Sequence, residues 1–102
     1  AAMKAHKEWS DLPWVERASL MLRVAELLAT KYRYILNASV MLGQSKNPFQ
    51  AEIDAPCELI DFLRFSTFYA SQVYADQPYS EKGILNRMEY RALEGFVFSL
   101  SL

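Results

Sequence analysis

Three carboxylates follow one another at helical spacing in the middle of the chain: Asp54, Glu58 and Asp61. Intervals of four and three residues place them on one ridge of a helix, and Arg64, three residues further on, is a possible partner for Asp61. The ordinary interpretation of such a ridge is a solvated stripe. The alternative is that a carboxylate faces a pocket and binds a cationic group, because an unpaired buried charge is too costly to keep. Composition does not choose between the two.

Covalent catalysis is not expected from these residues. A nucleophile needs a base within reach, and Cys57, the only thiol, falls on the apolar side of a helix, where burial leaves a thiol unreactive. His6, the only histidine, stands beside Lys7 and is interpreted as an exposed spectator. One cysteine and one histidine cannot form a Cys/His zinc site, and the three glycines lie too far apart for a phosphate-binding loop. We therefore assign no catalytic and no metal-binding residue.

The elements that position these side chains are mainly helical. Residues 13–32 predict an amphipathic helix that starts at Asp11 and Pro13, because a short polar acceptor followed by proline suits a first turn. Residues 34–42 predict a second helix ending at Gly43, with a loop at residues 45–48. The apolar face of the first helix is expected to contain Leu20, Met21, Val24, Leu27 and Leu28.

The longest predicted helix spans residues 49–75 and is apolar around most of its circumference. A helix of this kind is normally buried, which a chain of 102 residues can hardly achieve alone. Pro56 lies inside it, so the helix either begins near Asp54 or is kinked there. Its aromatic residues are interpreted as core rather than as a ligand-binding box: Phe62, Phe65, Phe68 and Tyr69.

After residue 78 the hydrophobic period changes from helical to two. Residues 84–91 and 96–102 alternate in this way and are predicted to be two strands, joined around Glu94 and Gly95. Two strands alone are only marginally stable, so we expect other residues to complete their sheet. The chain also starts without methionine and stops in an apolar run. These features predict an excerpt of a longer protein.

Composition excludes several classes of protein. The chain is 52% hydrophobic with a net charge of −1, which excludes a disordered chain and gives no basic patch for nucleic acid or an anionic membrane. No apolar run is long enough to span a bilayer. A single cysteine excludes an internal disulfide and is typical of a reducing compartment.

Several runs of residues resemble one family in a single collinear register. They resemble the N-terminal part of the delta-1-pyrroline-5-carboxylate dehydrogenases, also called L-glutamate γ-semialdehyde dehydrogenases, within the aldehyde dehydrogenase superfamily. The resemblance covers the whole chain but only about a fifth of a subunit. The runs that carry it are Asp11-Leu12-Pro13-Trp14, Met41-Leu42-Gly43-Gln44, Gln50-Ala51-Glu52-Ile53-Asp54, Glu58-Leu59-Ile60-Asp61-Phe62 and Leu93-Glu94-Gly95-Phe96-Val97.

The resemblance implies an α/β parent fold, of which this chain is a mostly α-helical part with two β-strands near its C-terminus. Residues 1–78 would be the helical part of the N-terminal cofactor-binding domain. Residues 79–95 would belong to a β oligomerisation element. Residues 96–102 would be the first strand leading into the cofactor-binding region.

The resemblance also implies an activity. The parent enzyme would oxidise L-glutamate γ-semialdehyde to L-glutamate with NAD in proline catabolism, through a catalytic cysteine and glutamate that lie beyond residue 102, so Cys57 is not the nucleophile and the chain alone is inactive. Ser101 aligns with a residue where a strand end approaches NAD. Glu58 matches a glutamate on the helix that flanks the aldehyde tunnel, and would bind the substrate's α-ammonium group, whereas Asp54 and Asp61 gain no such role.

The implied partners are a small-molecule substrate and further copies of the same subunit, with no nucleic acid and no membrane. The implied location is the cytoplasm in a bacterium and the mitochondrial matrix in a eukaryote. A different class of protein stays open from the residues alone: a free-standing helical interaction module without catalysis, which associates through its exposed apolar faces.

Overall fold

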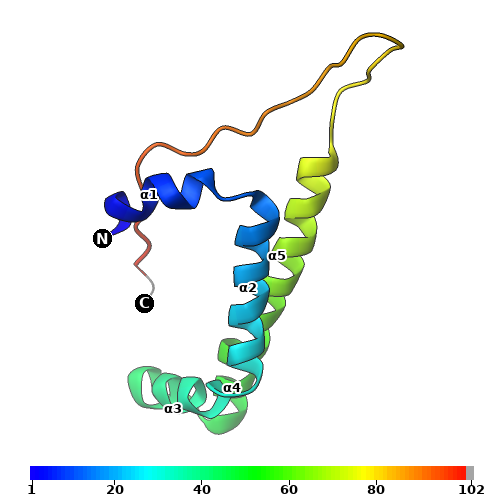
Figure 1. Ribbon diagram of the computed structural model, residues 1–102. Helices are drawn as coiled ribbons and strands as arrows, with labels where there is room; N and C mark the ends of the chain where they lie inside the picture. Colours follow the sequence, from blue (N-terminus) through cyan, green and yellow to red (C-terminus); the bar gives the residue numbers. More distant parts are fainter. Residues whose placement is uncertain (101–102) are drawn as a thin grey trace.

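Helices account for all regular structure in the computed structural model, which describes residues 1–100 (Figure 1). The helix predicted at residues 13–32 begins at Trp14, because Pro13 occupies the cap position. Asp11 does not cap it, since this residue ends the preceding helix and binds the Lys7 ammonium at 2.6 Å. In chain order the elements are α1 (Ala2–Asp11), α2 (Trp14–Ala29), α3 (Arg33–Gln44), α4 (Pro48–Glu52), the π-helix η1 (Ile53–Cys57) and α5 (Glu58–Ala75).

The turn between α3 and α4 differs from its prediction by two residues. Gly43 is still helical, and the left-handed residue that ends α3 is Ser45, with φ of 57°. Asn47 then caps α4. Its side-chain oxygen accepts a hydrogen bond from the backbone N–H of Gln50 at 2.9 Å, and the side-chain oxygen of Gln50 accepts one from the backbone N–H of Asn47 at 3.3 Å. Pro48 takes the first helical position, where no N–H is needed. The prediction of Gly43 as the terminus was therefore wrong.

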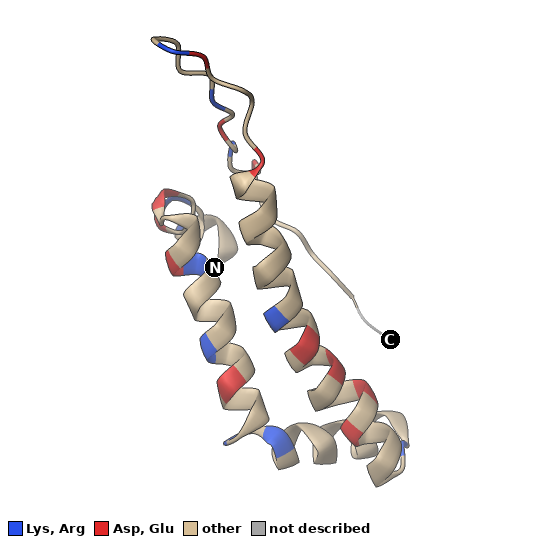
Figure 2. Ribbon diagram, turned by 90° about the vertical axis from the view of Figure 1, so that its right-hand side faces the viewer, with Lys and Arg blue, Asp and Glu red and all other residues tan. Residues whose placement is uncertain are grey.

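Helices α2 and α5 lie side by side and run in opposite directions, with α3 and α4 across one end of the pair (Figures 1 and 2). Ala18 and Met21 of α2 line a hollow together with residues of α5, and Ala25, which follows them at helical spacing on the same side of α2, is fully buried. The predicted apolar face is only partly correct, because Leu20 and Val24 stay 46% and 43% exposed. One neighbouring helix covers only part of so wide an apolar arc. The buried residues of the described chain are Ala25, Ala51, Ala55, Pro56 and Ile60.

Helix α5 is exposed over much of its surface, in line with the expectation that a chain of this length can hardly bury so apolar a helix. Ile60 is its only buried residue, while Phe62 and Phe65 are 62% and 57% exposed. The physical reason is size: within residues 1–100, α2, the short elements at one end and the contacts of Tyr90 at the other end cover only part of α5. The aromatic residues predicted to be core thus lie on the surface of this chain.

The helical path continues through Pro56 by widening instead of breaking. In an α-helix the N–H of residue 56 would donate a hydrogen bond to the carbonyl of Glu52, and proline has no N–H to do so. The chain responds with the π-helix η1, in which the Glu58 amide donates to the carbonyl of Ile53, five residues earlier. Pro56 itself is less than 2% exposed, so this turn is packed.

Residues 76–100 contain no strand, so the prediction of strands is wrong for residues 84–91 and for the described part of 96–102; residues 101 and 102 lie outside the described residues. A strand needs a second strand that pairs with its backbone N–H and C=O groups, and no other part of residues 1–100 pairs with this segment in that way. It extends beyond the end of α5, reverses near Gly83 and returns past α1 (Figure 1). The apolar residues do alternate in the sequence, but no strand among residues 1–100 pairs with this segment.

The returning segment is fixed to the helices by three polar and aromatic contacts. The Tyr90 hydroxyl donates to the carbonyl of Val73 at 2.6 Å, and its ring meets the Tyr74 ring edge-on at 4.8 Å. His6 Nε2 donates to the carbonyl of Leu93 at 2.7 Å. His6 is half-buried and holds α1 to this segment, so its description as an exposed spectator was wrong.

No helix among residues 1–100 is long and apolar enough to cross a membrane.

Candidate functional site

An open hollow of about 750 Å³ runs along one side of η1 and the first half of α5. It combines carboxylates with aromatic faces. Residues on both sides of Pro56 share this surface. The hollow is lined by Ile53, Asp54, Cys57, Glu58, Asp61, Phe62, Phe65, Ser66 and Tyr69.

The acidic ridge predicted from the sequence exists, and its members differ in their partners. Figure 2 shows the acidic positions following one another along η1 and α5. Asp54 binds the Lys46 ammonium at 2.7 Å. Arg64 turns to Glu26 on α2, at 3.9 Å, so its expected pairing with Asp61 does not form.

Glu58 and Asp61 are therefore the carboxylates of the hollow that are not paired with another described side chain. Both are exposed, and among residues 1–100 no side chain forms an ion pair or hydrogen bond with either carboxylate. Next to them lie the rings of Phe62, Phe65 and Tyr69. A carboxylate beside aromatic faces suits a cationic group, since the ring faces attract cations and the carboxylate pairs with them.

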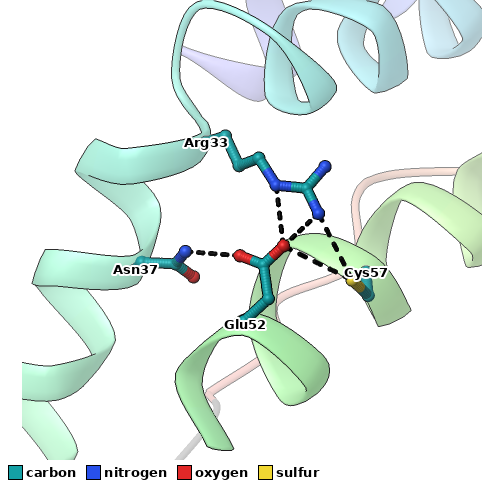
Figure 3. A network of polar contacts seen from close by, with 4 residues as sticks. All are labelled: Arg33, Asn37, Glu52 and Cys57. Carbon is teal, nitrogen blue, oxygen red and sulfur yellow. Dashed lines mark hydrogen bonds and ion pairs between the residues drawn. The ribbon is translucent and has the colours of Figure 1, made fainter. Parts of the chain in front are cut away.

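A second carboxylate site, which the sequence did not predict, includes Cys57, one of the residues that line this hollow (Figure 3). Glu52 Oε1 accepts hydrogen bonds from Arg33 Nε, at 2.7 Å, and from Arg33 Nη2. Glu52 Oε2 accepts a hydrogen bond from Asn37 Nδ2 at 2.5 Å. Both donors come from α3, whereas Glu52 ends α4. The Cys57 sulfur, at the end of η1, lies 3.7 Å from Arg33 Nη2 and 3.8 Å from Glu52 Oε1. We call these four residues the Glu52 network.

The Glu52 network keeps its two charges. Hydrogen bonds from Arg33 and then Asn37 lower the pKa of Glu52 below its usual value, against a smaller opposing effect of burial. The hydrogen bond to Glu52 raises the pKa of Arg33. Cys57 is half-buried beside this ion pair, not in the apolar surroundings expected from the sequence. The network joins α3 to both ends of η1.

Glu52 should make the stability of the full-length protein depend on pH. Its pKa is lowered by folding, so its stabilisation is fully present above the usual glutamate value of 4.5 and is lost as the pH falls through the lower folded pKa. We expect the difference in Tm between the wild type and Glu52→Gln to be clear at about pH 7 and to shrink toward about pH 4. A difference that does not change with pH contradicts this account. Glu8→Gln, an exposed carboxylate on α1, is the matched control.

The remaining predictions concern Ser101, metal ligands and Cys57. Ser101 lies outside the described residues, and its role near NAD stays a prediction. Among residues 1–100 no group of three His, Cys, Asp or Glu side chains could hold a metal ion. No described base stands beside Cys57 in the way that a nucleophile needs, since its polar neighbours are a guanidinium and a carboxylate that already bind each other.

Sequence reasoning missed the Glu52 network because Arg33 and Asn37 of α3 lie 15 to 24 residues from Glu52 and Cys57 in the chain. Glu52 does stand within the Gln-Ala-Glu-Ile-Asp run that carries the family resemblance. A charged residue between apolar neighbours on a helix is the available signal that a partner exists. The spacing alone does not say that the partner is Arg33.

A second hollow, of about 550 Å³, lies where α1 meets the returning segment. The ring of Trp14 stacks on Tyr74 at 4.9 Å, and Arg17 Nη2 donates to the Tyr74 hydroxyl at 3.1 Å. Tyr90 closes the stack from the returning segment. Since these rings and the guanidinium are used in joining α1, α2 and α5 to residues 90–97, we interpret this cluster as structural.

A sequence profile of the aldehyde dehydrogenase family matches residues 1–101, and the chain belongs to this family. It is 54% identical over 102 residues to the probable delta-1-pyrroline-5-carboxylate dehydrogenase of Schizosaccharomyces pombe, and 50% identical to the mitochondrial delta-1-pyrroline-5-carboxylate dehydrogenase of Emericella nidulans. These two alignments each cover 99% of this chain.

A solved structure shares the fold at similar identity. The delta-pyrroline-5-carboxylate dehydrogenase of Mycobacterium tuberculosis, in a crystal structure with bound NAD, superposes on 93% of this chain with a TM-score of 0.88 and 53% identity. The chain spans about a fifth of the length of these relatives: 19% and 18% of the two fungal proteins and 18% of the mycobacterial chain.

Proposed function

We propose that the full-length protein containing this chain is an NAD-dependent dehydrogenase that oxidises L-glutamate γ-semialdehyde, formed from pyrroline-5-carboxylate, to L-glutamate in proline catabolism. The observation that carries the proposal is the match of nearly the whole chain, at 50–54% identity, to dehydrogenases named for this substrate. The structure adds a chemically suitable surface, because the substrate carries an ammonium group and the hollow presents Glu58 beside aromatic rings.

The role proposed for this chain is to recognise the substrate. Glu58 would bind the α-ammonium group, and Phe62 and Phe65 would exclude water from this contact. The aldehyde end of the substrate would then be held toward reacting groups outside this chain, including the catalytic cysteine and glutamate. Orientation of this kind lowers a barrier without any bond being formed by Glu58 itself.

NAD would accept the hydride in this reaction, but residues 1–100 do not fit as its binding site. Their three glycines, Gly43, Gly83 and Gly95, are separated by 40 and 12 residues and cannot form a phosphate-binding loop. The cofactor proposal thus depends on the relatives, one of which was solved with NAD bound. Ser101 remains the one residue of this chain proposed to approach it.

The larger organisation is also a proposal. Residues 1–78 would form the helical part of the cofactor-binding domain, residues 79–95 would serve in oligomerisation, and residues 96–102 would lead into the cofactor-binding region. Support comes from the segment beyond α5, which projects from the helices before it returns past α1 and whose residues are mostly exposed (Figure 1). Some eukaryotic relatives are named mitochondrial. We propose the mitochondrial matrix for a eukaryotic source and the cytoplasm for a bacterial one.

The test compares the full-length protein with the 102-residue chain. We expect the full-length protein to form NADH from NAD with L-glutamate γ-semialdehyde and the 102-residue chain to form none, because no described residue is a nucleophile with a base. Absence of activity in the folded full-length protein contradicts the proposal. The competing interpretation, a free-standing helical interaction module, requires the short chain to unfold cooperatively as a monomer, which its exposed aromatic residues make unfavourable.

A further inference from the structure

The residue just before the proposed ammonium-binding Glu58 belongs to an unusual turn. Glu58 follows Cys57, the last residue of η1, and its amide donates to the carbonyl of Ile53, five residues earlier. In an α-helix this amide would bind the carbonyl four residues earlier. The direction in which Glu58 leaves the helix is therefore set by the π-turn.

Pro56 enforces this turn. A regular α-helix would need an N–H on residue 56 for the carbonyl of Glu52, and the proline ring would clash with that carbonyl. The wide turn removes both problems. Pro56 and Ala55 are buried, so the turn is held by packing as well as by the missing donor.

The Glu52 network fixes both ends of the same turn. Glu52 immediately precedes η1 and is bound by Arg33 and Asn37 of α3. Cys57 ends η1, and its sulfur lies 3.7 Å from the Arg33 guanidinium (Figure 3). A turn tied to α3 at both of its ends cannot rotate freely, so the residue that follows it has a defined orientation.

We propose that the π-turn at η1, enforced by Pro56 and anchored by Glu52 to Arg33, is the positioning device that aims Glu58 at the substrate's ammonium group. This inference rests on the proposed function. It adds that substrate specificity depends on Pro56 and Glu52, neither of which needs to touch the substrate. Pro56 and Glu52 are positioning residues and act through Glu58.

The test uses the full-length protein and measures one ratio: kcat/KM for L-glutamate γ-semialdehyde divided by kcat/KM for a simple aliphatic aldehyde. Pro56→Ala restores the N–H and lets the segment return toward a regular α-helix. We expect this ratio to fall by about three- to tenfold, through KM for the charged substrate, because misplacement weakens the contact without removing it. Glu52→Gln should lower the ratio in the same direction. Pro48→Ala is the matched control, since Pro48 stands at a helix start where no N–H is needed and is exposed.

A double variant distinguishes positioning from general structural damage. If Pro56 acts through Glu58, then Pro56→Ala added to Glu58→Gln should lower the ratio no further. An unchanged ratio in Pro56→Ala, with a clear loss in Glu58→Gln, overturns the inference and leaves the proposed function intact. An additive loss in the double variant also overturns it. A wild-type protein that does not oxidise the semialdehyde contradicts the proposed function instead.

Discussion

Replacing Glu58 by glutamine in the full-length protein should lower kcat/KM for L-glutamate γ-semialdehyde by roughly 10- to 100-fold. Glutamine keeps the size of the side chain and removes the charge, so it loses the charge-assisted part of the contact with the ammonium group. For a simple aliphatic aldehyde, kcat/KM should stay within about threefold, because that substrate has no ammonium group to bind. Steady-state NADH formation with both aldehydes measures the effect.

Two further variants show whether the effect belongs to Glu58 itself. Asp61→Asn removes another carboxylate of the same hollow, and an equal loss there would indicate a general negative potential, not a specific contact. Glu16→Gln, an exposed carboxylate of α2 outside the hollow, controls for net charge. Equal losses on both aldehydes in Glu58→Gln would contradict the ammonium contact, since they would indicate damage to the common part of the reaction.

The partners of the acidic ridge are set by contacts between residues far apart in the chain. Spacing alone placed Asp54, Glu58 and Asp61 on one ridge, and the structure confirms that they share a surface. Spacing could not show that Lys46 takes Asp54, or that Arg64 turns to Glu26 on another helix. Which carboxylates stay available depends on how α2, α3 and α5 are brought together.

Local rules predicted the helices well and their ends less well. Pro13 and Pro48 mark the starts of α2 and α4 because a missing N–H costs nothing there. Gly43 was expected to end α3, yet Ser45 adopts the left-handed conformation, which a propensity for glycine does not exclude. At Pro56 the sequence allowed a late start or a kink, and the chain adopted the wider π-turn, because helical residues on both sides keep the segment packed.

The two predicted strands failed for a different reason. Alternation of apolar residues in segments 84–91 and 96–102 describes which side chains could share a face, but a strand exists only when another backbone accepts and donates its hydrogen bonds. Within residues 1–100 no such partner is present, and the segment is held instead by Tyr90 and by the contact of His6 with Leu93. An alternation of apolar residues thus predicts a strand only where a second strand is present to pair with it.

Introducing a charge between α2 and α5 should strongly destabilise the full-length protein. Ala25 is 0% exposed and follows Ala18 and Met21, which line a hollow together with residues of α5, at helical spacing on the same side of α2. Ala25→Asp would bury an unpaired carboxylate in a contact that has room only for a methyl group. We expect a loss of roughly 3 to 5 kcal/mol in the free energy of unfolding, seen as a lower Tm and a lower yield of folded protein.

Matched variants separate the causes of this loss. Ser19→Asp introduces the same side chain at an exposed polar position of α2 and should change the free energy of unfolding by no more than about 0.5 kcal/mol. Ala25→Asn, which equals aspartate in size but is neutral, should fall between the two. An unchanged Tm in Ala25→Asp would mean that Ala25 is not buried in the contact between α2 and α5. Because η1 and Glu58 are continuous with α5, the contact between α2 and α5 also supports the surface on which substrate recognition is proposed to depend.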